Sequence, residues 1–218
     1  MPWLGYFYKI SQSDVFVFLD DAQFSNEGMH NWHYLKTAQG SFRLKIPVQQ
    51  RLGDPINAVR TKDELGWKVK HLKSIETNYS NTKFFDIVFP FFSEILLQDY
   101  DNISALNSSI IRNICDRFGI HTEFAYSSDL NISTKREEKV LDIIEALKGD
   151  VYYSGTGAKV YQNEANFNQR GIELRYSTFI PFEYAQQFEA FQANVSIIDY
   201  LMNCGFDWVQ VLKQQHNH

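Results

Sequence analysis

The stretch that decides the fold is Asp14-Val15-Phe16-Val17-Phe18-Leu19-Asp20-Asp21-Ala22-Gln23-Phe24-Ser25. Its five consecutive apolar residues do not alternate with polar ones, which is typical of a strand buried on both faces of an α/β sheet. Asp20, Asp21 and Gln23 follow where that strand should end. Because open α/β sheets bind ligands at the carboxyl ends of their strands, these residues form a first candidate site. The alternative is that Asp20 or Asp21 only caps a turn or the next helix.

The composition of the 218-residue chain, 44% hydrophobic and 16% aromatic, is typical of an ordered globular protein. Its length fits a single domain over residues 1–218. A net charge of −5 without long lysine or arginine runs argues against nucleic acid as a partner. No apolar stretch is long enough to span a membrane and no secretion signal is visible, so we expect a cytoplasmic protein. Cys115 and Cys204 form no CxxC pair, and we expect them to be buried thiols.

Strand-like and helix-like patterns alternate along the chain, most clearly in its last third. We therefore expect an α/β fold with a doubly wound, mostly parallel sheet flanked by helices. A small β-hairpin insertion is expected around the turn at 52–55, with strands at 41–48 and 56–60. The remaining expected strands are 121–126, 150–154 and 172–176, and the expected helices are 3–10, 66–79, 82–97, 102–118, 135–147, 159–167 and 196–204.

Local signals place the ends of several of these elements. Pro90 should kink or split the helix at 82–97, because proline removes a backbone donor. Gly119 suits the position after a helix end, and Thr134 followed by Glu137 predicts a capping box. A doubly wound sheet normally begins with a strand, whereas this chain begins with a helix at 3–10. We therefore expect the natural protein to have one more strand upstream of residue 1.

A second candidate site is the turn Ser154-Gly155-Thr156-Gly157-Ala158, between an expected strand and an expected helix. Closely spaced glycines there would let backbone N–H groups face an anion at a helix N-terminus, and the Ser154 and Thr156 hydroxyls would add donors. The pattern is neither a dinucleotide-binding fingerprint nor a P-loop. An ordinary tight turn between strand and helix is the alternative.

Two further segments carry histidines. Residues 27–39 are polar, aromatic and aperiodic, which is typical of a long substrate loop, and they contain His30, Asn31 and His33. No third ligand lies near the two histidines in sequence, so we expect no metal site. On the helix at 66–79, Lys70 and His71 could reach an anion, although a solvated basic helix face would look the same.

Several segments of the chain carry a resemblance to a known family: Pro2-Trp3-Leu4-Gly5-Tyr6-Phe7, residues 14–24, Trp67 with Lys70-His71-Leu72, Tyr152–Ala158 with Tyr161, and residues 196–205. Through these segments the chain resembles the WbqC-like protein family over nearly its whole length. Members usually begin with an additional strand and a Gln-Pro turn, and they carry an Asn-Arg-Asn-Arg-like stretch where this chain has His30-Asn31-Trp32-His33. The loss of both arginines weakens a phosphate-binding role for that loop.

The resemblance implies a role in bacterial O-antigen and other surface-polysaccharide biosynthesis, with a nucleotide-linked amino sugar as the small-molecule substrate. Acyl or aminoacyl transfer is the activity it suggests, while it indicates no cofactor and no oligomeric state. In this hypothesis the catalytic candidates are Asp20, Asp21, His33 and His71. A histidine is favoured as the base because its ordinary pKa lies near neutral pH. The substrate-binding candidates are Gln23, Asn31, Lys70, Ser154, Gly155, Thr156, Gly157 and Tyr161.

Two other functions stay open from the sequence. Asp-Asp-x-Gln-Phe after a strand, with a later Ser-Gly-Thr-Gly turn, looks somewhat like adenylating α/β enzymes, which favours ATP-using nucleotidyl transfer. A non-catalytic binding protein that assists a glycosyltransferase would need no positioned base. A serine nucleophile is not expected, because the chain has no Gly-x-Ser-x-Gly elbow.

Overall fold

A computed structural model describes residues 1–216, which form two compact units. Unit 1 contains Met1–Phe7, Ala22–Ile120 and the chain from Ile180 onward, and unit 2 contains Tyr8–Asp21 and His121–Phe179. Helix α1 (Leu4–Ser11) contributes residues to both units. The single domain expected over residues 1–218 stays a prediction.

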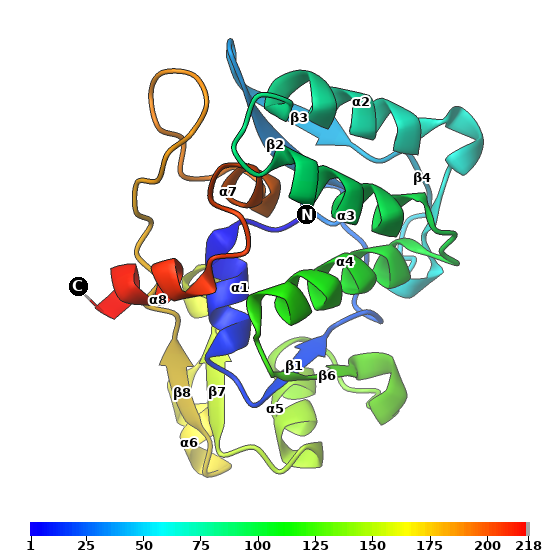
Figure 1. Ribbon diagram of the computed structural model, residues 1–218. Helices are drawn as coiled ribbons and strands as arrows, with labels where there is room; N and C mark the ends of the chain where they lie inside the picture. Colours follow the sequence, from blue (N-terminus) through cyan, green and yellow to red (C-terminus); the bar gives the residue numbers. More distant parts are fainter. Residues whose placement is uncertain (217–218) are drawn as a thin grey trace. The chain divides into compact units, whose positions relative to one another are not determined.

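Unit 2 is built from two parallel strand pairs and two helices (Figure 1). Strand β1 (Val15–Phe18) pairs with β6 (Glu123–Tyr126), and β7 (Val151–Ser154) pairs with β8 (Glu173–Tyr176). Helices α5 (Arg136–Ala146) and α6 (Glu164–Gln169) pack on the second pair through a small apolar core. That core consists of the buried residues Leu141, Ile144, Phe167 and Ile172, with Val140, Tyr152 and Leu174 against it. Short 3₁₀ helices, η3 (Ser127–Leu130) and η4 (Thr156–Tyr161), follow β6 and β7.

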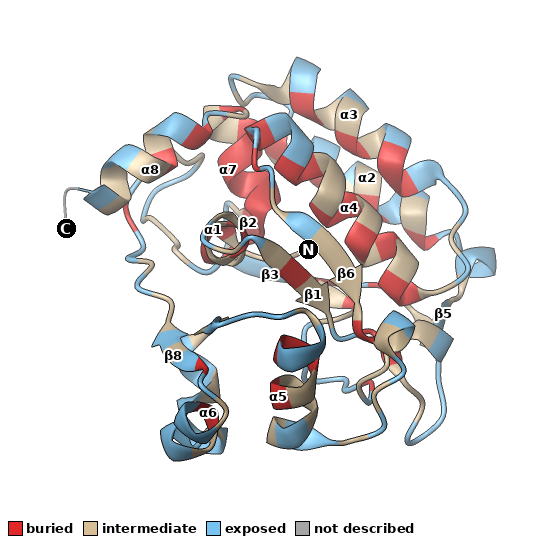
Figure 2. Ribbon diagram, turned by 90° about the horizontal axis from the view of Figure 1, so that it is seen from below, coloured by how far each residue is buried: buried red, intermediate tan, exposed pale blue. Residues whose placement is uncertain are grey.

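Unit 1 is mainly helical, and its helices alternate buried and exposed residues along their length (Figure 2). The alternation follows the amphipathic pattern of the sequence, so each helix buries one face. The helices are α2 (Trp67–Tyr79), α3 (Phe85–Leu97), α4 (Ile103–Phe118), α7 (Ile197–Cys204) and α8 (Trp208–His216). The strands form two antiparallel hairpins, β2 (Trp32–Thr37) with β3 (Gly40–Lys45) and β4 (Val48–Gln49) with β5 (Arg60–Thr61). Two 3₁₀ turns, η1 (Ile56–Ala58) and η2 (Asp63–Leu65), flank β5.

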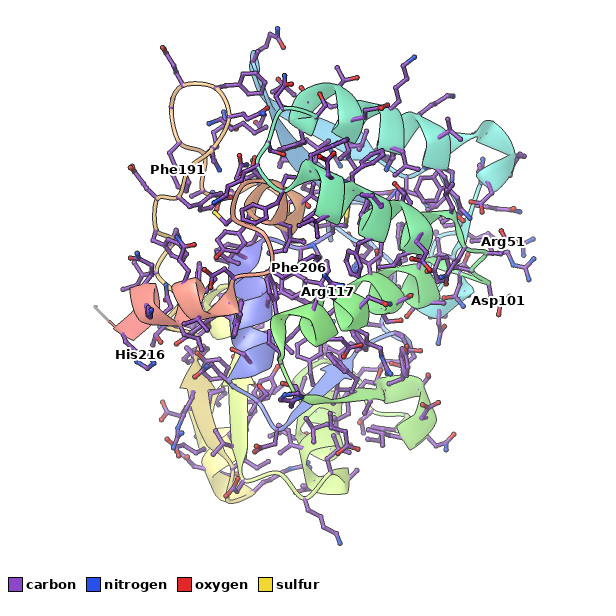
Figure 3. The ribbon with its side chains drawn as sticks, viewed as in Figure 1. Arg51, Asp101, Arg117, Phe191, Phe206 and His216 are labelled. Carbon is purple, nitrogen blue, oxygen red and sulfur yellow. The ribbon has the colours of Figure 1, made fainter. Side chains whose placement is uncertain are left out.

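Helix α4 shows how the sequence sets an element's ends. The Asn102 side chain accepts a hydrogen bond from the backbone N–H of Ala105 at 2.9 Å, which caps the first turn. Gly119 ends the helix with φ of 70°, a conformation that favours glycine. In the last turn the Arg117 guanidinium lies 4.5 Å from the centre of the Phe206 ring (Figure 3). This contact ties the end of α4 to the segment before α8.

The fold is mixed α/β, but the expected continuous sheet is not what these strands form. Among the described residues the strands make four separate two-stranded sheets, and β1 pairs only with β6. The prediction of a central strand at 14–19 was therefore wrong, although its position in the chain was right. An apolar run can also arise because helices and aromatic rings cover a short strand. Phe18, for example, stacks on Phe124 with ring centres 5.5 Å apart.

Two local predictions also failed, and the prediction that Pro90 would kink or split a helix is contradicted only for splitting. The expected loop at 27–39 contains strand β2, because residues 32–37 pair along their whole length with β3 across a tight turn. Thr134 caps no helix, since its hydroxyl donates instead to the Asp142 carboxylate at 2.6 Å. Helix α3 continues through Pro90 without being split. The expected hairpin near 52–55 is present only in part, as the short pair β4 and β5. Most of the predicted first strand is β3, which pairs with β2, and η1 takes most of the predicted second strand.

Candidate functional site

Asp20 joins the carboxyl ends of the parallel strands β1 and β6. The side chain is 7% exposed, and its Oδ1 accepts a hydrogen bond from the backbone N–H of Ser128 at 3.0 Å. The Ser128 hydroxyl donates to Oδ2 at 2.7 Å, and the Ser127 hydroxyl oxygen lies 3.3 Å from Oδ1. Both carboxylate oxygens are therefore occupied, so Asp20 is well placed to hold this strand end in a fixed shape.

Asp21 is the more accessible of the two aspartates, with a side chain 25% exposed. Its Oδ1 accepts from the Ser127 hydroxyl and its Oδ2 from Lys139 Nζ, both at 2.5 Å. Partial burial alone would raise the pKa of Asp21, but the hydrogen bonds from Lys139 and Ser127 outweigh it and lower the pKa below its usual value. A carboxylate and an ammonium group thus meet at the tip of two parallel strands.

The backbone of the turn after β7 has open space beside its two glycines. Gly155 has an ordinary φ of −73°, and a Cβ added at Gly155 or Gly157 would meet no atom within 4 Å. Neither backbone conformation nor packing within the described residues therefore requires glycine at these two positions. Ser154 itself is buried, at 2% exposure, and its hydroxyl accepts a hydrogen bond from Gln162 at 3.0 Å. Tyr161, at the end of η4, is 80% exposed.

The predicted histidines lie in unit 1 and are buried. His33 and His71 are 1% and 3% exposed, with ring centres 6.0 Å apart. Burial lowers the pKa of His71 to about 4, and burial together with the neighbouring His71 lowers the pKa of His33 well below its usual value. His71 Nε2 lies 3.2 Å from the backbone oxygen of Lys45. Both imidazoles are therefore neutral at pH 7, and their role as a base stays a prediction.

The other predicted binding residues of unit 1 have structural contacts. Asn31 Nδ2 donates to the backbone oxygen of Ile46 at 3.0 Å. Gln23 lies in an isolated bridge with Pro55, and the exposed Lys70 donates to the backbone oxygen of Leu65 at 3.1 Å. In the part of the chain that the structure describes, no group of three or more His, Cys, Asp or Glu residues could hold a metal ion.

The structure thus places the predicted site residues in two sets. Asp20, Asp21, the Ser154 to Gly157 turn and Tyr161 belong to unit 2, while Gln23, Asn31, His33, Lys70 and His71 belong to unit 1. Sequence analysis missed Ser127, Ser128 and Lys139. The two serines follow a predicted strand, so the rule that singled out Asp20 would also have found them. Lys139 carries no such signal, because only the fold brings it to Asp21.

Unit 1 also holds a buried polar network that the sequence did not indicate. The Tyr79 and Tyr184 hydroxyls donate to the two oxygens of Asp199 at 3.0 and 2.9 Å. Tyr79 accepts from the backbone N–H of Lys36, and Lys36 Nζ donates to Gln186 at 3.0 Å. Lys36 and Asp199 are 1% and 0% exposed. Burial raises the pKa of Asp199, against the hydrogen bonds from Tyr184 and Tyr79.

Comparison with known proteins agrees with the resemblance seen in the sequence. The sequence profile of the WbqC-like protein family matches residues 1–211. The chain belongs to the WbqC-like protein family. This WbqC-like protein is 30% identical over 209 residues to the uncharacterized protein Rv1507c of Mycobacterium tuberculosis (strain ATCC 25618 / H37Rv), covering 94% of this chain and 90% of that protein. No solved structure matches it. No helix of the described residues is long and apolar enough to cross a membrane.

Proposed function

We propose that this WbqC-like protein is a transferase of bacterial surface-polysaccharide biosynthesis. Its substrate in this proposal is a nucleotide-linked amino sugar, which receives an acyl or aminoacyl group on its amine. Membership of the family supports the pathway, through the role that the resemblance implies. The chemistry of unit 2 supports the class of substrate.

The observation that carries the proposal is the pair of Asp21 and Lys139 at the tip of β1 and β6. The lowered pKa keeps Asp21 ionised at neutral pH, so it can attract and orient the ammonium form of a sugar amine. Lys139 donates to Oδ2 of the same carboxylate and can also bind a carbonyl or phosphate oxygen. Asp20 acts in this scheme as a positioning residue, since it is buried, whereas the Asp21 side chain is 25% exposed.

The turn after β7 is the second part of the proposed site. Parallel strands in α/β proteins present such turns to anionic ligands, whose oxygens accept hydrogen bonds from backbone N–H groups. The open space at Gly155 and Gly157 would let a diphosphate approach the backbone closely. The exposed ring of Tyr161 is available for contact with the nucleoside.

The test is a ligand panel of nucleotide amino sugars, ATP and acyl-coenzyme A, read by thermal unfolding of the full chain. A ligand at 100 times its dissociation constant should stabilise the protein by about 2.7 kcal/mol. We expect stabilisation by a nucleotide amino sugar. Asp21→Asn should weaken its binding about tenfold or more, because a charged partner of the amine is lost. The matched control is Asp129→Asn, which removes an exposed carboxylate in the neighbouring η3 turn.

Each other outcome contradicts part of the proposal. Stabilisation by ATP alone would favour nucleotidyl transfer. An absence of stabilisation by any of the ligands would favour a non-catalytic binding protein. Equal binding by the Asp21→Asn and Asp129→Asn variants would remove Asp21 from the site even if a nucleotide sugar binds.

A further inference from the structure

The hairpin of β4 and β5 in unit 1 borders two hollows that share Gln50. The first, of about 540 Å³, is lined by Gln49, Gln50, Arg51, Asp54, Ala58 and Arg60. The second, of about 370 Å³, is lined by Asn26, Lys45, Pro47, Val48, Gln50, Lys62 and Leu65. Both volumes lie in the range of small-molecule sites, roughly 300–1,000 Å³. The residues that line the two hollows are named together the hairpin surface.

Strand pairing explains why these side chains meet. Gln49 lies directly opposite Arg60 in the antiparallel register, so both side chains are on one face of the hairpin. Beyond the paired residues, the backbone N–H of Lys62 donates to the oxygen of Pro47 at 2.9 Å. This bond continues the ladder and brings Lys62 to the second hollow. Gln49, Gln50, Arg51 and Arg60 are exposed, whereas Asp54 and Lys62 are half-buried.

Four cations line the hairpin surface, two in each hollow: Arg51 and Arg60, then Lys45 and Lys62. Within residues 1–216 none of the four forms an ion pair. The one lining carboxylate, Asp54, accepts a hydrogen bond from the backbone N–H of Arg51 at 2.6 Å. The acidic residue after Lys62, Asp63, lines neither hollow and pairs with Lys68 at 3.0 Å.

This clustering is unusual for a chain of net charge −5. Cations close to one another repel, so a group of four with one carboxylate favours a bound anion. Arginine binds phosphate with two parallel hydrogen bonds, and lysine binds it as a point charge. The amides of Gln49 and Gln50 add neutral donors. Concave hollows of this size suit a small molecule better than a flat protein surface.

We propose that the hairpin surface binds a small organic molecule with two separated phosphate groups, one in the arginine hollow and one in the lysine hollow. The site is independent of the function proposed for unit 2, whose residues it does not use. It would provide this protein with a binding site for a second, phosphorylated ligand.

The experiment measures binding of adenosine 3′,5′-bisphosphate, AMP and adenosine to the full chain by calorimetry at low and high salt. We expect the bisphosphate to bind about tenfold or more tightly than AMP, and adenosine to bind weakest, because each phosphate adds charge-assisted hydrogen bonds. Added salt should weaken the bisphosphate most. The double variant Arg51→Gln/Arg60→Gln should lower the affinity for bisphosphate to that of AMP for the wild type, and Lys45→Gln/Lys62→Gln should do the same.

The matched control is Lys70→Gln/Lys73→Gln, which removes two exposed cations beside another hollow of unit 1, on α2. This control should leave bisphosphate binding unchanged, and so should Asp21→Asn. The experiment therefore tests the hairpin surface separately from the transferase proposal. Urea unfolding of each variant confirms that it is folded.

Three outcomes would overturn the proposal: equal affinity for bisphosphate and AMP, an equal loss in the α2 control, or tighter binding of polyglutamate than of the bisphosphate. The last of these would assign the surface to an acidic protein partner.

Discussion

Each of the two units contains an aspartate whose carboxylate lies between polar partners. The two carboxylates differ in their burial and in the direction in which their pKa is shifted. Asp199 in unit 1 is fully buried, and burial raises its pKa. Asp21 in unit 2 is partly exposed, and its hydrogen bonds lower its pKa despite some burial. The pKa of an aspartate is therefore raised at position 199 and lowered at position 21. Desolvation dominates at Asp199, and hydrogen-bond donors dominate at Asp21.

The difference separates structural from functional roles. A carboxylate enclosed by two tyrosine hydroxyls cannot meet a substrate without unfolding part of unit 1, so Asp199 is expected to contribute to stability. The Asp21 carboxylate pairs with Lys139 at the end of β1 and is partly exposed, so it remains accessible to a ligand. Asp21 is therefore expected to contribute little to stability and much to binding.

The largest effect that tests this comparison should come from Asp199→Ala. The change leaves the Tyr79 and Tyr184 hydroxyls without their acceptor and removes a carboxylate that attracts the buried Lys36 ammonium. Removing one partner from such a buried group costs about 3–5 kcal/mol of unfolding free energy, measurable by urea denaturation. Asp199→Asn keeps the shape and one acceptor, so its loss should be smaller. A loss below about 1 kcal/mol for Asp199→Ala would contradict the structural role.

A smaller effect concerns His71 and the dependence of stability on pH. Its pKa of about 4 in the folded protein lies below its ordinary value of 6.5, so the unfolded chain binds more protons between these values. The unfolding free energy should therefore fall as the pH is lowered from 6.5 to 4, by about 3 kcal/mol for this residue. Urea denaturation of the wild type and of His71→Gln at several pH values measures the difference.

Other groups do not obscure this test. His33 acts in the same direction as His71, so His71→Gln should keep part of the fall. Asp199 acts in the opposite direction, because a raised pKa in the folded state favours folding at low pH. Since both groups remain in the variant, the difference between the two proteins reports the titration of His71 together with the effect of His71 on the pKa of His33. Identical pH profiles would show that His71 is not buried in solution.

The smallest effect should come from Lys139→Met. The Asp21–Lys139 ion pair is partly exposed, with side chains 25% and 16% exposed, and such pairs contribute about 0–1 kcal/mol. We expect a change in unfolding free energy within that range together with a loss of nucleotide-sugar binding. A loss as large as that of Asp199→Ala would make the pair structural and would erase the contrast between the two units.

Local signals predicted the elements well where the sequence itself contains the cause. The Asn102 cap and Gly119 place the ends of α4 within a residue, and the strand at 150–154 is present as β7. Predictions failed where another part of the chain decides the local structure. Residues 32–37 form a strand only because β3 pairs with them. Thr134 caps no helix because the Asp142 carboxylate competes for its hydroxyl.

The residues of the candidate site also fall into those that a local sequence pattern could predict and those that it could not. Asp20 and Asp21 could be found from the sequence, because a strand pattern ends just before them. Their partners could not, since Ser127 is separated from Asp20 by 107 positions along the chain. The histidines were expected to be accessible, but strand pairing and the packing of α2 bury them. Burial then lowers their pKa values, which no local pattern predicts.

The interruption of unit 2 by residues 22–120 has a consequence for biosynthesis. Strand β1 is synthesised about a hundred residues before β6, with which it pairs in the described part of the chain. Until then β1 and both aspartates lack the partners that the structure gives them, namely β6, Ser127, Ser128 and Lys139. The proposed substrate site therefore forms only after residues 22–120 have been synthesised. A nascent chain halted near residue 120 would expose this strand to chaperones and proteases.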